Sequence, residues 1–474
     1  MKQVFHEVDT LDKRCYEKYA LSEDILMENA SSAIRHYIYK KFPKQSKILI
    51  VTGSGNNGAD GIALARSLHG AYQAHLYLAI EPKSKMALLQ YERAQKIGVP
   101  VVSSLEGEYL VVIDCIFGSG LSKPLGSATA SIIETLNNKT AHKIACDIPS
   151  GAFGAHITHK QGIVFQADHT FTMGALKTSL FEDKHKDFVG KIKVVSLGLS
   201  TEKYEDESQI FCLQKSDLTL PFRTKQNTHK GEFGHICVVA SEDKNAKLGA
   251  GILALKAGLT LGAGLCTLRT NERYLGEPEI MLSQEIPKNA NAIGIGMGLG
   301  EVSSDFLAQI KSHILDNNLS CVIDADLFYT HETLDFLEHK KAVLTPHPKE
   351  FCSLLTLTKT ATISLEELQN NRFLYLEKIS QKYPNCTILL KGANTLIASE
   401  GKIYINPHGS SALSKGGSGD VLAGVILAYL AQGFSARESA VNGSLVHAVG
   451  SGKVKNNFAL TPMGLIEGMK EIQI

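Results

Sequence analysis

Short apolar runs alternate with helix-like segments along the first half of the chain. Residues 47–52 and 74–78 are apolar runs with the length of buried strands, and the segment 60–69 between them has helical spacing. Two further apolar runs end in Asp114 and Asp147. Buried parallel strands show such continuous apolar character, and their carboxyl ends meet at one edge of the sheet. The pattern predicts an α/β domain with both aspartates at its ligand-binding edge.

A second series of the same kind begins further along the chain. With 474 residues, the chain is longer than the roughly 100–200 residues of one domain. The apolar periodicity weakens between residues 200 and 229, where polar residues dominate as in a linker. An apolar run at 235–240 then predicts a strand, and the small-residue segment 248–262 predicts a helix. We therefore expect two α/β domains, 1–212 and 213–474.

The composition is that of an ordinary globular protein. Hydrophobic residues make up 44% of the chain and charged residues 20%, and the formal net charge is +1. A nearly neutral chain without a stripe of basic and aromatic residues is not expected to bind nucleic acid. No uninterrupted apolar run reaches the roughly 20 residues of a membrane-spanning helix, so we expect no membrane partner either.

The nine cysteines are scattered, and none forms a CxxC pair. Most of them lie in apolar runs, as Cys237 does. An odd, unclustered set in a chain with no signal peptide indicates free thiols rather than a disulfide framework or a zinc site. We expect a cytoplasmic protein.

Two glycine-rich turns of different design carry the candidate chemistry. Residues 53–61 read Gly-Ser-Gly-Asn-Asn-Gly-Ala-Asp-Gly, and residues 416–420 read Gly-Gly-Ser-Gly-Asp ahead of an apolar helix. Glycines at a strand-to-helix turn let backbone N–H groups approach an anion, and the start of the helix adds partial positive charge. The two turns predict two sites for phosphorylated ligands.

The first turn adds side-chain oxygens to its backbone N–H groups. Asn56, Asn57 and Asp60 supply carbonyl and carboxylate oxygens, which suit a hard cation beside phosphates. The same residues could simply cap the following helix, because Asn and Asp are favoured there. Glu81, after the second strand, also leaves an ordinary dinucleotide site open.

Three motifs in order make the N-terminal half resemble the YjeF N-terminal family, the epimerases of hydrated NADH and NADPH, NAD(P)HX. The motifs are the turn at 53–61, the run 114–121 and the run 147–151. The resemblance spans residues 1–212 and implies a Rossmann-like three-layer α/β/α domain. It implies a K⁺ ion held by Asn57, Asp114 and Ser150. It also implies contacts of the hydrated dinucleotide with Asn56, Asn57, Gly58, Ala59, Asp60, Gly118, Ser119, Gly120, Leu121, Ser122, Lys123, Pro124 and Asp147.

Two of these positions need comment. Ala59 stands where the family has glycine, a change that leaves the turn intact if φ is negative. Asp147 is our candidate for the catalytic acid or base, because epimerisation at C6 of the hydrated nicotinamide moves a proton and a hydroxyl at one carbon. A purely structural aspartate in a turn is the alternative.

The second turn combines main-chain N–H groups with a carboxylate. The N–H groups can stabilise charge on a transferred phosphoryl group, and Asp420 can accept a proton from an attacking hydroxyl. These are the parts of a kinase without a Walker A sequence. The structural alternative is a helix start that uses Asp420 as a cap and the glycines for a bend.

Weaker motifs accompany the second turn at 229–234, 294–300, 345–350 and 389–395. In this order they resemble the YjeF C-terminal family, the ADP-dependent NAD(P)HX dehydratases, whose fold is ribokinase-like. The resemblance covers residues 214–474. It implies that the hydrate contacts Ala250, Gly298, His347 and Asp420. It implies that the adenine nucleotide contacts Lys391, Gly392, Ala393, Asn394, Thr395 and Gly419.

The C-terminal half departs from that family at two positions. Lys349 stands where the family has glycine after His-Pro, and Lys415 replaces a small residue ahead of the glycine turn. Both changes bear on nucleotide preference rather than on the class of enzyme. His347 could orient the substrate or cap a turn bounded by prolines.

The implied reaction is a dehydration driven by phosphorylation. The C6 hydroxyl becomes a phosphate, which leaves as the electrons of the ring nitrogen restore the dihydropyridine. ADP is the expected phosphoryl donor, with ATP possible, and Mg²⁺ is expected to bridge the nucleotide phosphates.

We therefore predict a bifunctional repair enzyme, an isomerase and a lyase in one chain. It epimerises the R and S hydrates and dehydrates the S hydrate, converting ADP to AMP and phosphate. Its expected partners are small molecules and further copies of itself in a homo-oligomer. Two alternatives are a C-terminal kinase of a vitamin precursor and an N-terminal binding module. Asn57, Asp114 and Asp147 argue against the binding module, which has no chemical need for those oxygens.

Overall fold

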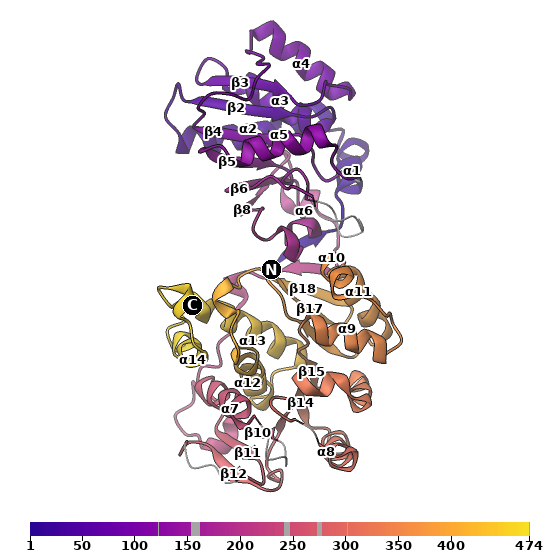
Figure 1. Cartoon of the computed structure of the whole chain (residues 1–474), viewed down its shortest axis with the longest axis vertical. Coiled ribbons are helices and arrows are strands. Elements are labelled where there is room, and N and C mark those ends of the chain that lie inside the picture. The colour runs from indigo at the N-terminus through magenta and orange to yellow at the C-terminus, as the bar shows by residue number, and fades with distance from the viewer. Residues whose placement is uncertain (122, 153–161, 241–246, 273–276, 301, 474) are drawn as a thin grey trace. The chain divides into compact units, whose positions relative to one another are not determined.

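The computed structural model describes residues 1–121, 123–152, 162–240, 247–272, 277–300 and 302–473. The chain divides into two units, one of residues 3–208 and one of residues 209–474 with Met1 and Lys2 (Figure 1). Strand β9 (Ile210–Cys212) pairs with β18 (Lys402–Asn406), so the division falls shortly before the boundary expected at 213. Among the described residues, no helix is long and apolar enough to cross a membrane.

A parallel sheet forms the centre of the N-terminal unit, in the order β3-β2-β4-β5-β6-β8. Its strands are β2 (Lys47–Thr52), β3 (Gln73–Leu78), β4 (Val111–Cys115), β5 (His142–Cys146), β6 (His169–Met173) and β8 (Lys191–Val195). Two short strands, β1 (Lys2–Phe5) and β7 (Leu176–Lys177), pair in parallel with each other and are not part of this sheet. The helices are α1 (Asp9–Tyr19), α2 (Glu23–Lys41), α3 (Asn56–Leu68), α4 (Lys85–Ile97), α5 (Ser127–Asn137) and α6 (Thr201–Tyr204).

Helices cover both faces of this sheet. Apolar side chains of α2 and α3, such as Ile34 and Ile62, share a core with Ile50 on one face. Ile133 of α5 packs with Val112 on the other face. This three-layer arrangement confirms the Rossmann-like domain expected from the sequence.

The strand order gives the N-terminal sheet a switch point between β2 and β4. The chain passes from β2 to β3 on one side and then returns to β4 on the other side of β2. At such a switch point the loops after neighbouring strands diverge and leave room for a ligand beyond their carboxyl ends. The turn at 53–61 follows β2, Asp114 lies in β4 and Asp147 follows β5. The expected site residues therefore share this edge.

The sheet of the C-terminal unit runs in the order β12-β11-β10-β13-β14-β15-β16-β17-β18-β9. Only β17 runs antiparallel to its neighbours among these described strands. The strands not yet bounded are β10 (His235–Val239), β11 (Leu265–Arg269), β12 (Met281–Ser283), β13 (Ala292–Ile295), β14 (Ser320–Ile323), β15 (Ala342–Leu344), β16 (Thr387–Leu390) and β17 (Thr395–Ser399). The helices are α7 (Leu248–Thr260), α8 (Ser304–Asp316), α9 (Pro348–Leu357), α10 (Leu365–Asn370), α11 (Arg372–Lys382), α12 (Ser418–Ala431), α13 (Ala436–Ser451) and α14 (Pro462–Lys470).

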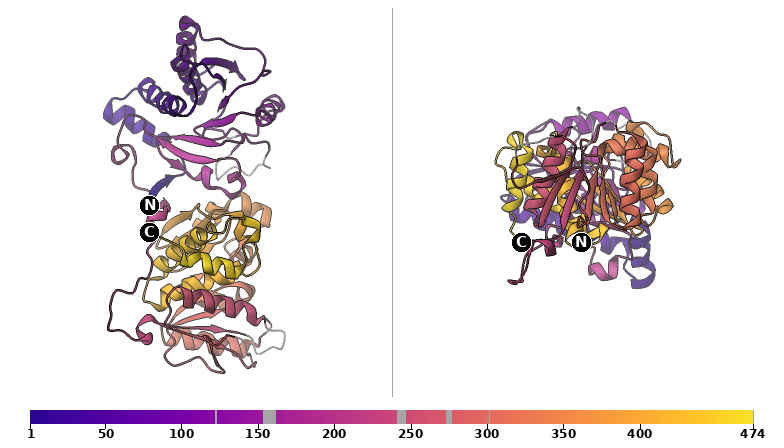
Figure 2. Two further views of the ribbon diagram at one scale, coloured as in Figure 1. Left: turned by 90° about the vertical axis from the view of Figure 1, so that its left-hand side faces the viewer. Right: turned by 90° about the horizontal axis from the view of Figure 1, so that it is seen from below.

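Small residues let α7 and α12 pack closely on one face of the second sheet. A Cβ at Gly424 would stand 1.9 Å from Ala254 O, and one at Gly258 would stand 3.1 Å from Gly424 O. Helix α12 is buried along almost its whole length, which explains its lack of a polar face. In Figure 2 the yellow helices and the orange helices lie on opposite sides of this sheet. The tight packing fixes where α12 begins, at the second glycine turn.

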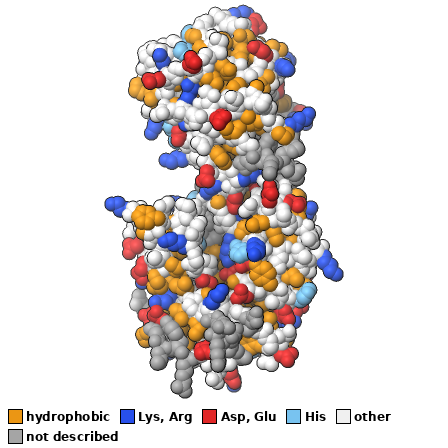
Figure 3. Space-filling view, in the orientation of Figure 1, with side chains coloured by type: hydrophobic (Ala, Val, Ile, Leu, Met, Phe, Trp, Pro, Cys, Tyr) orange, Lys and Arg blue, Asp and Glu red, His pale blue; other side chains and the backbone are white. Residues whose placement is uncertain are grey.

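Charged side chains of both signs are interspersed over the face drawn in Figure 3. This distribution agrees with the formal net charge of +1. Recognition of a charged ligand at either glycine-rich turn must therefore come from groups close to the ligand rather than from a long-range electrostatic field.

Candidate active sites

The turn after β2 is packed so closely that it requires glycine. A Cβ at Gly53 would stand 2.0 Å from Ile116 O, and a Cβ at Gly58 would stand 2.0 Å from Gly53 O. Ala59 is fully buried in α3 and its φ is not positive, so alanine fits where the family has glycine. Gly53 N donates to Cys115 O at 3.1 Å and Ala59 N donates to Gly55 O at 3.0 Å, so an anion at the start of the helix could be bound only by the N–H groups between them.

Asn57 has a buried amide with no partner. Asn56 and Asn57 begin α3 and do not cap it, because the N-cap is Gly55 and no side-chain capping bond forms. Asn56 donates to Glu23 Oε1 at 3.2 Å. Oδ1 and Nδ2 of Asn57 are both buried without a hydrogen-bond partner among the described residues. Such a group costs about 1–3 kcal/mol when left unpaired, so this arrangement favours a ligand at Asn57.

Asp114 and Ser150 form a buried hydrogen-bonded pair. Oδ1 of Asp114 accepts from the Ser150 hydroxyl at 2.7 Å and from Ile116 N at 3.1 Å, and Oδ2 accepts from Ser150 N at 2.7 Å. The Ser150 hydroxyl also accepts from Phe117 N at 2.9 Å. Burial raises the pKa of Asp114 to about 6 in spite of these bonds. Asp114 Oδ2 and Ser150 Oγ each keep a lone pair for a further ligand.

Asp147 is buried in an unusual backbone conformation. Its φ is +67°, in the left-handed region that a non-glycine residue adopts at a cost. Oδ1 lies 2.7 Å from Lys177 Nζ and 3.2 Å from Met173 N, while Oδ2 accepts from Ser119 N at 3.0 Å. Burial by itself would raise the pKa of this carboxyl, but the charge and hydrogen bond of Lys177 hold it below its ordinary value.

Gly118 lies close to the side chains of both Asp147 and Asn57. A Cβ at Gly118 would stand 2.9 Å from Asp147 Oδ2 and 3.4 Å from Asn57 Cγ. Ser119 and Gly120 are exposed, Leu121 is half-buried, and Lys123 and Pro124 are exposed; Ser122 lies outside the described residues. Of the expected epimerase residues, Asn57, Ser119 and Asp147 therefore come together around Gly118.

Three further charged groups interact electrostatically with Asp147: Lys177, Asp12 and Asp60. The sequence pattern did not identify the first two. Lys177 and Asp12 lie on β7 and α1, far along the chain from any recognised motif. The Tyr204 hydroxyl donates to Asp12 Oδ1 at 2.7 Å. Burial raises the pKa of Asp12, and burial together with the charge of Asp147 raises that of Asp60 well above its ordinary value. Asp60, already expected as a substrate contact, makes no hydrogen bond or ion pair among the described residues.

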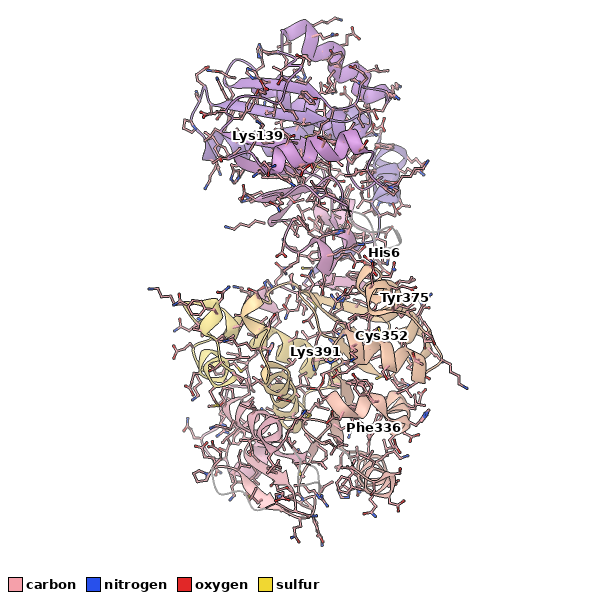
Figure 4. The ribbon with its side chains drawn as sticks, viewed as in Figure 1. His6, Lys139, Phe336, Cys352, Tyr375 and Lys391 are labelled. Atoms are coloured by element: carbon pink, nitrogen blue, oxygen red, sulfur yellow. The ribbon has the colours of Figure 1, made fainter. Side chains whose placement is uncertain are left out.

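The second glycine turn opens directly onto an ammonium group. Gly417 is the N-cap of α12 with φ +87°, and a Cβ there would stand 2.7 Å from Pro462 Cγ. A Cβ at Gly419 would stand 3.3 Å from Lys391 Nζ. Lys391 follows β16 and lies beside the helices of this unit (Figure 4). The turn therefore combines backbone N–H groups with a lysine, as an anion site requires.

Lys391 is held by Asp324 and not by Asp420. Its Nζ lies 2.6 Å from Asp324 Oδ1, and the Asp324 side chain is 3% exposed. Asp420 lies in the first turn of α12, where it makes no capping bond, so the capping alternative does not describe it. Burial and the negative charge of Asp324 raise the pKa of Asp420 to about 6, although Lys391 opposes them.

His347 is the N-cap of α9, in agreement with the expectation that it could cap a turn bounded by prolines. Its Nδ1 accepts from Glu350 N at 3.1 Å, and its backbone N donates to Glu350 Oε2 at 2.7 Å. Nε2 lies 3.1 Å from Glu350 Oε1, and nearly half of the His347 side chain is exposed. Burial, followed by the charge of Lys391, lowers the pKa of His347. The imidazole is therefore fixed by the cap and lies near the lysine of the candidate site.

The remaining expected residues fall into two groups. Ala250 and Gly298 lie together, because a Cβ at Gly298 would stand 3.1 Å from Ala250 Cβ, and Gly298 has φ +67°. The buried side chain of Arg372, which the sequence pattern did not identify, donates hydrogen bonds to the backbone of the loop 391–395. Its guanidinium is 1% exposed and donates to the carbonyls of Asn394 at 3.0 Å and Lys391 at 3.1 Å.

The exposure of that loop differs along its length. Gly392 and Ala393 are exposed, Asn394 is buried and Thr395 is half-buried. The exposed glycine and alanine are the part that a nucleotide could reach.

Comparisons with known proteins match both units. Residues 23–179 match the family described as YjeF-related protein N-terminus, and residues 236–472 match the family described as NAD(P)H-hydrate dehydratase. A bifunctional NAD(P)H-hydrate repair enzyme of Helicobacter pylori is 42% identical, with 100% of each chain covered. A protein of the same name from Dictyoglomus turgidum is 29% identical and covers 97% of this chain and 96% of its own. A solved ADP/ATP-dependent NAD(P)H-hydrate dehydratase of Bacillus subtilis, co-crystallised with ATP and Mg²⁺, is 24% identical over 52% of this chain and 92% of its own, with a TM-score of 0.44.

Proposed function

The chain belongs to the family of bifunctional NAD(P)H-hydrate repair enzymes, and we propose that its two glycine-rich turns mark the two active sites. The enzyme interconverts the R and S hydrates in its Rossmann-like unit and dehydrates the S hydrate in its ribokinase-like unit. The family matches support dehydration and not the phosphorylation of a vitamin precursor, the alternative left open by the sequence.

We propose Asp147 as the group that exchanges a proton with the C6 hydroxyl. The ionised carboxylate can take the proton of the C6 hydroxyl as C6 becomes a carbonyl and the C6–N1 bond passes its electron pair to N1, and it can return the proton when N1 adds to the other face of that carbonyl. One observation carries the proposal. Oδ2 of this buried carboxylate accepts from Ser119 N at 3.0 Å, whereas Lys177, Met173 and Thr172 all donate to Oδ1. A lone pair on Oδ2 therefore remains for the substrate.

We propose that Asn57, Asp114 and Ser150 would hold a K⁺ ion at this site. The donor set consists of oxygens, and the amide of Asn57 has no hydrogen-bond partner among the described residues, which fits a hard cation. The ion would supply positive charge beside the dinucleotide phosphates. Replacing K⁺ in the buffer by tetramethylammonium should slow epimerisation and leave dehydration unchanged. An equal loss of both activities would contradict this assignment.

In the C-terminal unit, we propose that Asp420 accepts the proton of the C6 hydroxyl. The hydroxyl oxygen attacks the terminal phosphorus of ADP, and AMP leaves. The N–H groups of Gly416, Gly417 and Gly419 and the Lys391 ammonium stabilise the charge on the phosphoryl group, whereas Ser418 N donates to Lys415 O. The phosphate then leaves C6 as the ring nitrogen donates its electron pair, and loss of a proton from C5 restores the dihydropyridine. The role of Lys391 rests on the 3.3 Å between its Nζ and a Cβ position at Gly419, and the role of Asp420 rests on its place in the first turn of α12, near Asp324 and Lys391.

The remaining binding roles follow from the same arrangement. We propose that residues 391–395 and Gly419 contact the nucleotide and that Ala250, Gly298 and His347 contact the hydrate. The carbonyl contacts of Arg372 support the first role because they fix the loop. Mg²⁺, bound with the nucleotide, would offset the negative charge of the phosphates.

One experiment tests the dual function. Purified protein receives a mixture of R and S hydrates with ADP or ATP, and each epimer is followed by chromatography. We expect both epimers to be consumed with ADP, with release of orthophosphate and recovery of the reduced-nicotinamide absorbance. Consumption of half of the hydrate would restrict the function to the dehydratase, and a stable phosphorylated product would contradict dehydration.

We also propose a cytoplasmic location and a homo-oligomer. All the cysteines except Cys352 are buried free thiols, as a reducing compartment permits. Fractionation of cells and light scattering of the purified protein test the two proposals. A mass of about one 51.4 kDa chain would contradict the oligomer.

A further inference from the structure

We propose that Lys177 is the positioning residue of the epimerase site, which fixes one oxygen of Asp147 so that the other faces the substrate. The ammonium group is buried, since Lys177 is 1% exposed. Nζ lies 2.7 Å from Asp147 Oδ1, 3.0 Å from Thr172 Oγ1 and 3.0 Å from Met173 O. This inference rests on the proposed role of Asp147.

Lys177 acts through Asp147 because its own hydrogen-bonding capacity is used. A lysine ammonium has three N–H donors, and the three oxygen atoms around Nζ take all of them. None is left for a substrate. Lys177 is therefore a positioning group and not a catalytic one.

One short segment supplies every contact to Oδ1 of Asp147. Thr172 and Met173 end β6, Lys177 ends β7, and all three donate to this oxygen, at 3.5, 3.2 and 2.7 Å. Oδ2 instead accepts from Ser119 N, in the loop expected to contact the dinucleotide. The two oxygens thus have separate tasks: Oδ1 is anchored to the protein, and Oδ2 faces Gly118, where the missing Cβ leaves room.

Lys177 also controls the charge of the site. The groups that interact electrostatically with Asp147 or Lys177 are Asp12 on α1, Asp60 on α3, Tyr204 on α6 and Cys146 on β5. Within the described ranges, all of them are neutral or acidic. Without Lys177, a buried Asp147 beside two further carboxyls would take up a proton at a higher pH, since burial and like charge both raise a carboxyl pKa. Lys177 therefore keeps Asp147 ionised as a base.

Two Lys177 variants separate the charge of the ammonium group from its hydrogen bonds. Lys177→Gln keeps a hydrogen-bond donor and removes the charge, and Lys177→Met removes both. R-to-S interconversion is measured against pH, with dehydration of the S hydrate by the same protein sample as the reference. In Lys177→Gln the acidic limb of the rate profile should move up by roughly 1–3 pH units, the usual effect of removing an adjacent opposite charge. In both variants kcat should fall more than KM rises.

Lys96→Met is the matched control. Lys96 Nζ lies 2.6 Å from Glu92 Oε1, an ion pair of similar length to that of Lys177, but both side chains are more than half exposed. This variant should leave the epimerase profile unchanged. Should the Lys177 variants not fold, Thr172→Val provides the test, because it removes one oxygen that holds the ammonium while keeping the side-chain shape. We expect a smaller shift of the acidic limb in the same direction.

Asp147→Asn distinguishes this inference from the function on which it rests. If Asp147→Asn epimerises at the wild-type rate, the proposed role of Asp147 is wrong. If Asp147→Asn is inactive but Lys177→Gln or Thr172→Val keeps the wild-type acidic limb, Asp147 is confirmed and the role of Lys177 is overturned.

Discussion

The two sites use the same parts but place their lysines differently. In the N-terminal unit, Lys177 bonds directly to Asp147, and its charge holds the pKa of that carboxyl below its ordinary value in spite of burial. In the C-terminal unit, Lys391 bonds to Asp324, and burial raises the pKa of Asp420 to about 6. The partner of the lysine, and not its presence, therefore decides in which direction the pKa of the candidate catalytic aspartate is shifted.

This difference fits the two reactions. A base with a pKa near 6 can take a proton from a hydroxyl near neutral pH and release it again, as the role proposed for Asp420 requires. In the same unit, Lys391 can stabilise phosphoryl charge because its ammonium lies at the glycine turn. In the N-terminal unit no phosphoryl group moves, and the three N–H donors of Lys177 all go to protein oxygens, those of Asp147, Thr172 and Met173.

The largest expected effect separates the two sites completely. Asp147→Asn and Asp420→Asn should each lower the rate at their own site by about 10²–10⁴-fold, the usual contribution of a general acid or base. The other activity of the same chain should keep its wild-type rate. Chromatography of the epimers and the reduced-nicotinamide absorbance measure the two activities. Loss of both activities from one substitution would break the comparison.

The role of Lys391 is tested by stability as well as activity. Lys391→Met leaves the carboxylate of Asp324, whose side chain is 3% exposed, without its cation. The free energy of unfolding of the C-terminal unit should fall by on the order of 3 kcal/mol, because an unpaired charge is left buried. Denaturant titration measures this change.

Lys391→Met with Asp324→Asn is the control for that prediction. The double variant should regain most of the stability, since no buried charge remains, but it should still lack dehydratase activity. Wild-type dehydratase activity in the double variant would show that Lys391 does not stabilise the phosphoryl group.

The pH dependence of the two activities should differ. Dehydration requires the ionised form of Asp420, so its kcat/KM should fall as the pH drops through about 6. At about pH 5 the expected loss is roughly tenfold, because a group one unit below its pKa is about one-tenth ionised. At saturating K⁺, epimerisation should persist there, since the pKa of Asp147 lies below its ordinary value and a bound cation favours the ionised form of Asp114. Parallel profiles for the two activities would contradict the contrast.

The smallest expected effect concerns His347. His347→Ala removes the cap of α9 and should cost about 1 kcal/mol of stability, whereas His347→Asn keeps a capping side chain. If His347 also contacts the hydrate, the KM for the hydrate should rise in both variants. A KM that rises only in His347→Ala would assign the residue to the cap alone.

Local patterns were enough to predict the elements that carry the sites. The apolar runs predicted strands whose carboxyl ends carry the turn at 53–61, Asp114 and Asp147. The structure confirms that all three lie at the same edge of the sheet. The helix expected at 60–69 begins earlier, at Asn56, because the asparagines occupy its first turn and do not cap it. Helix ends depend on such details, which hydrophobic spacing does not contain.

The sequence determined the fold class, the two glycine turns and the aspartates beside them, because each depends on residues that are close together in the chain. Only the tertiary structure decided which groups surround those aspartates. Lys177 lies thirty positions after Asp147 on a two-residue strand, and Asp324 and Lys391 meet only when β14 and β16 enter the same sheet. Charge state in a buried site depends on such through-space partners, so the chemistry of each aspartate was settled by folding.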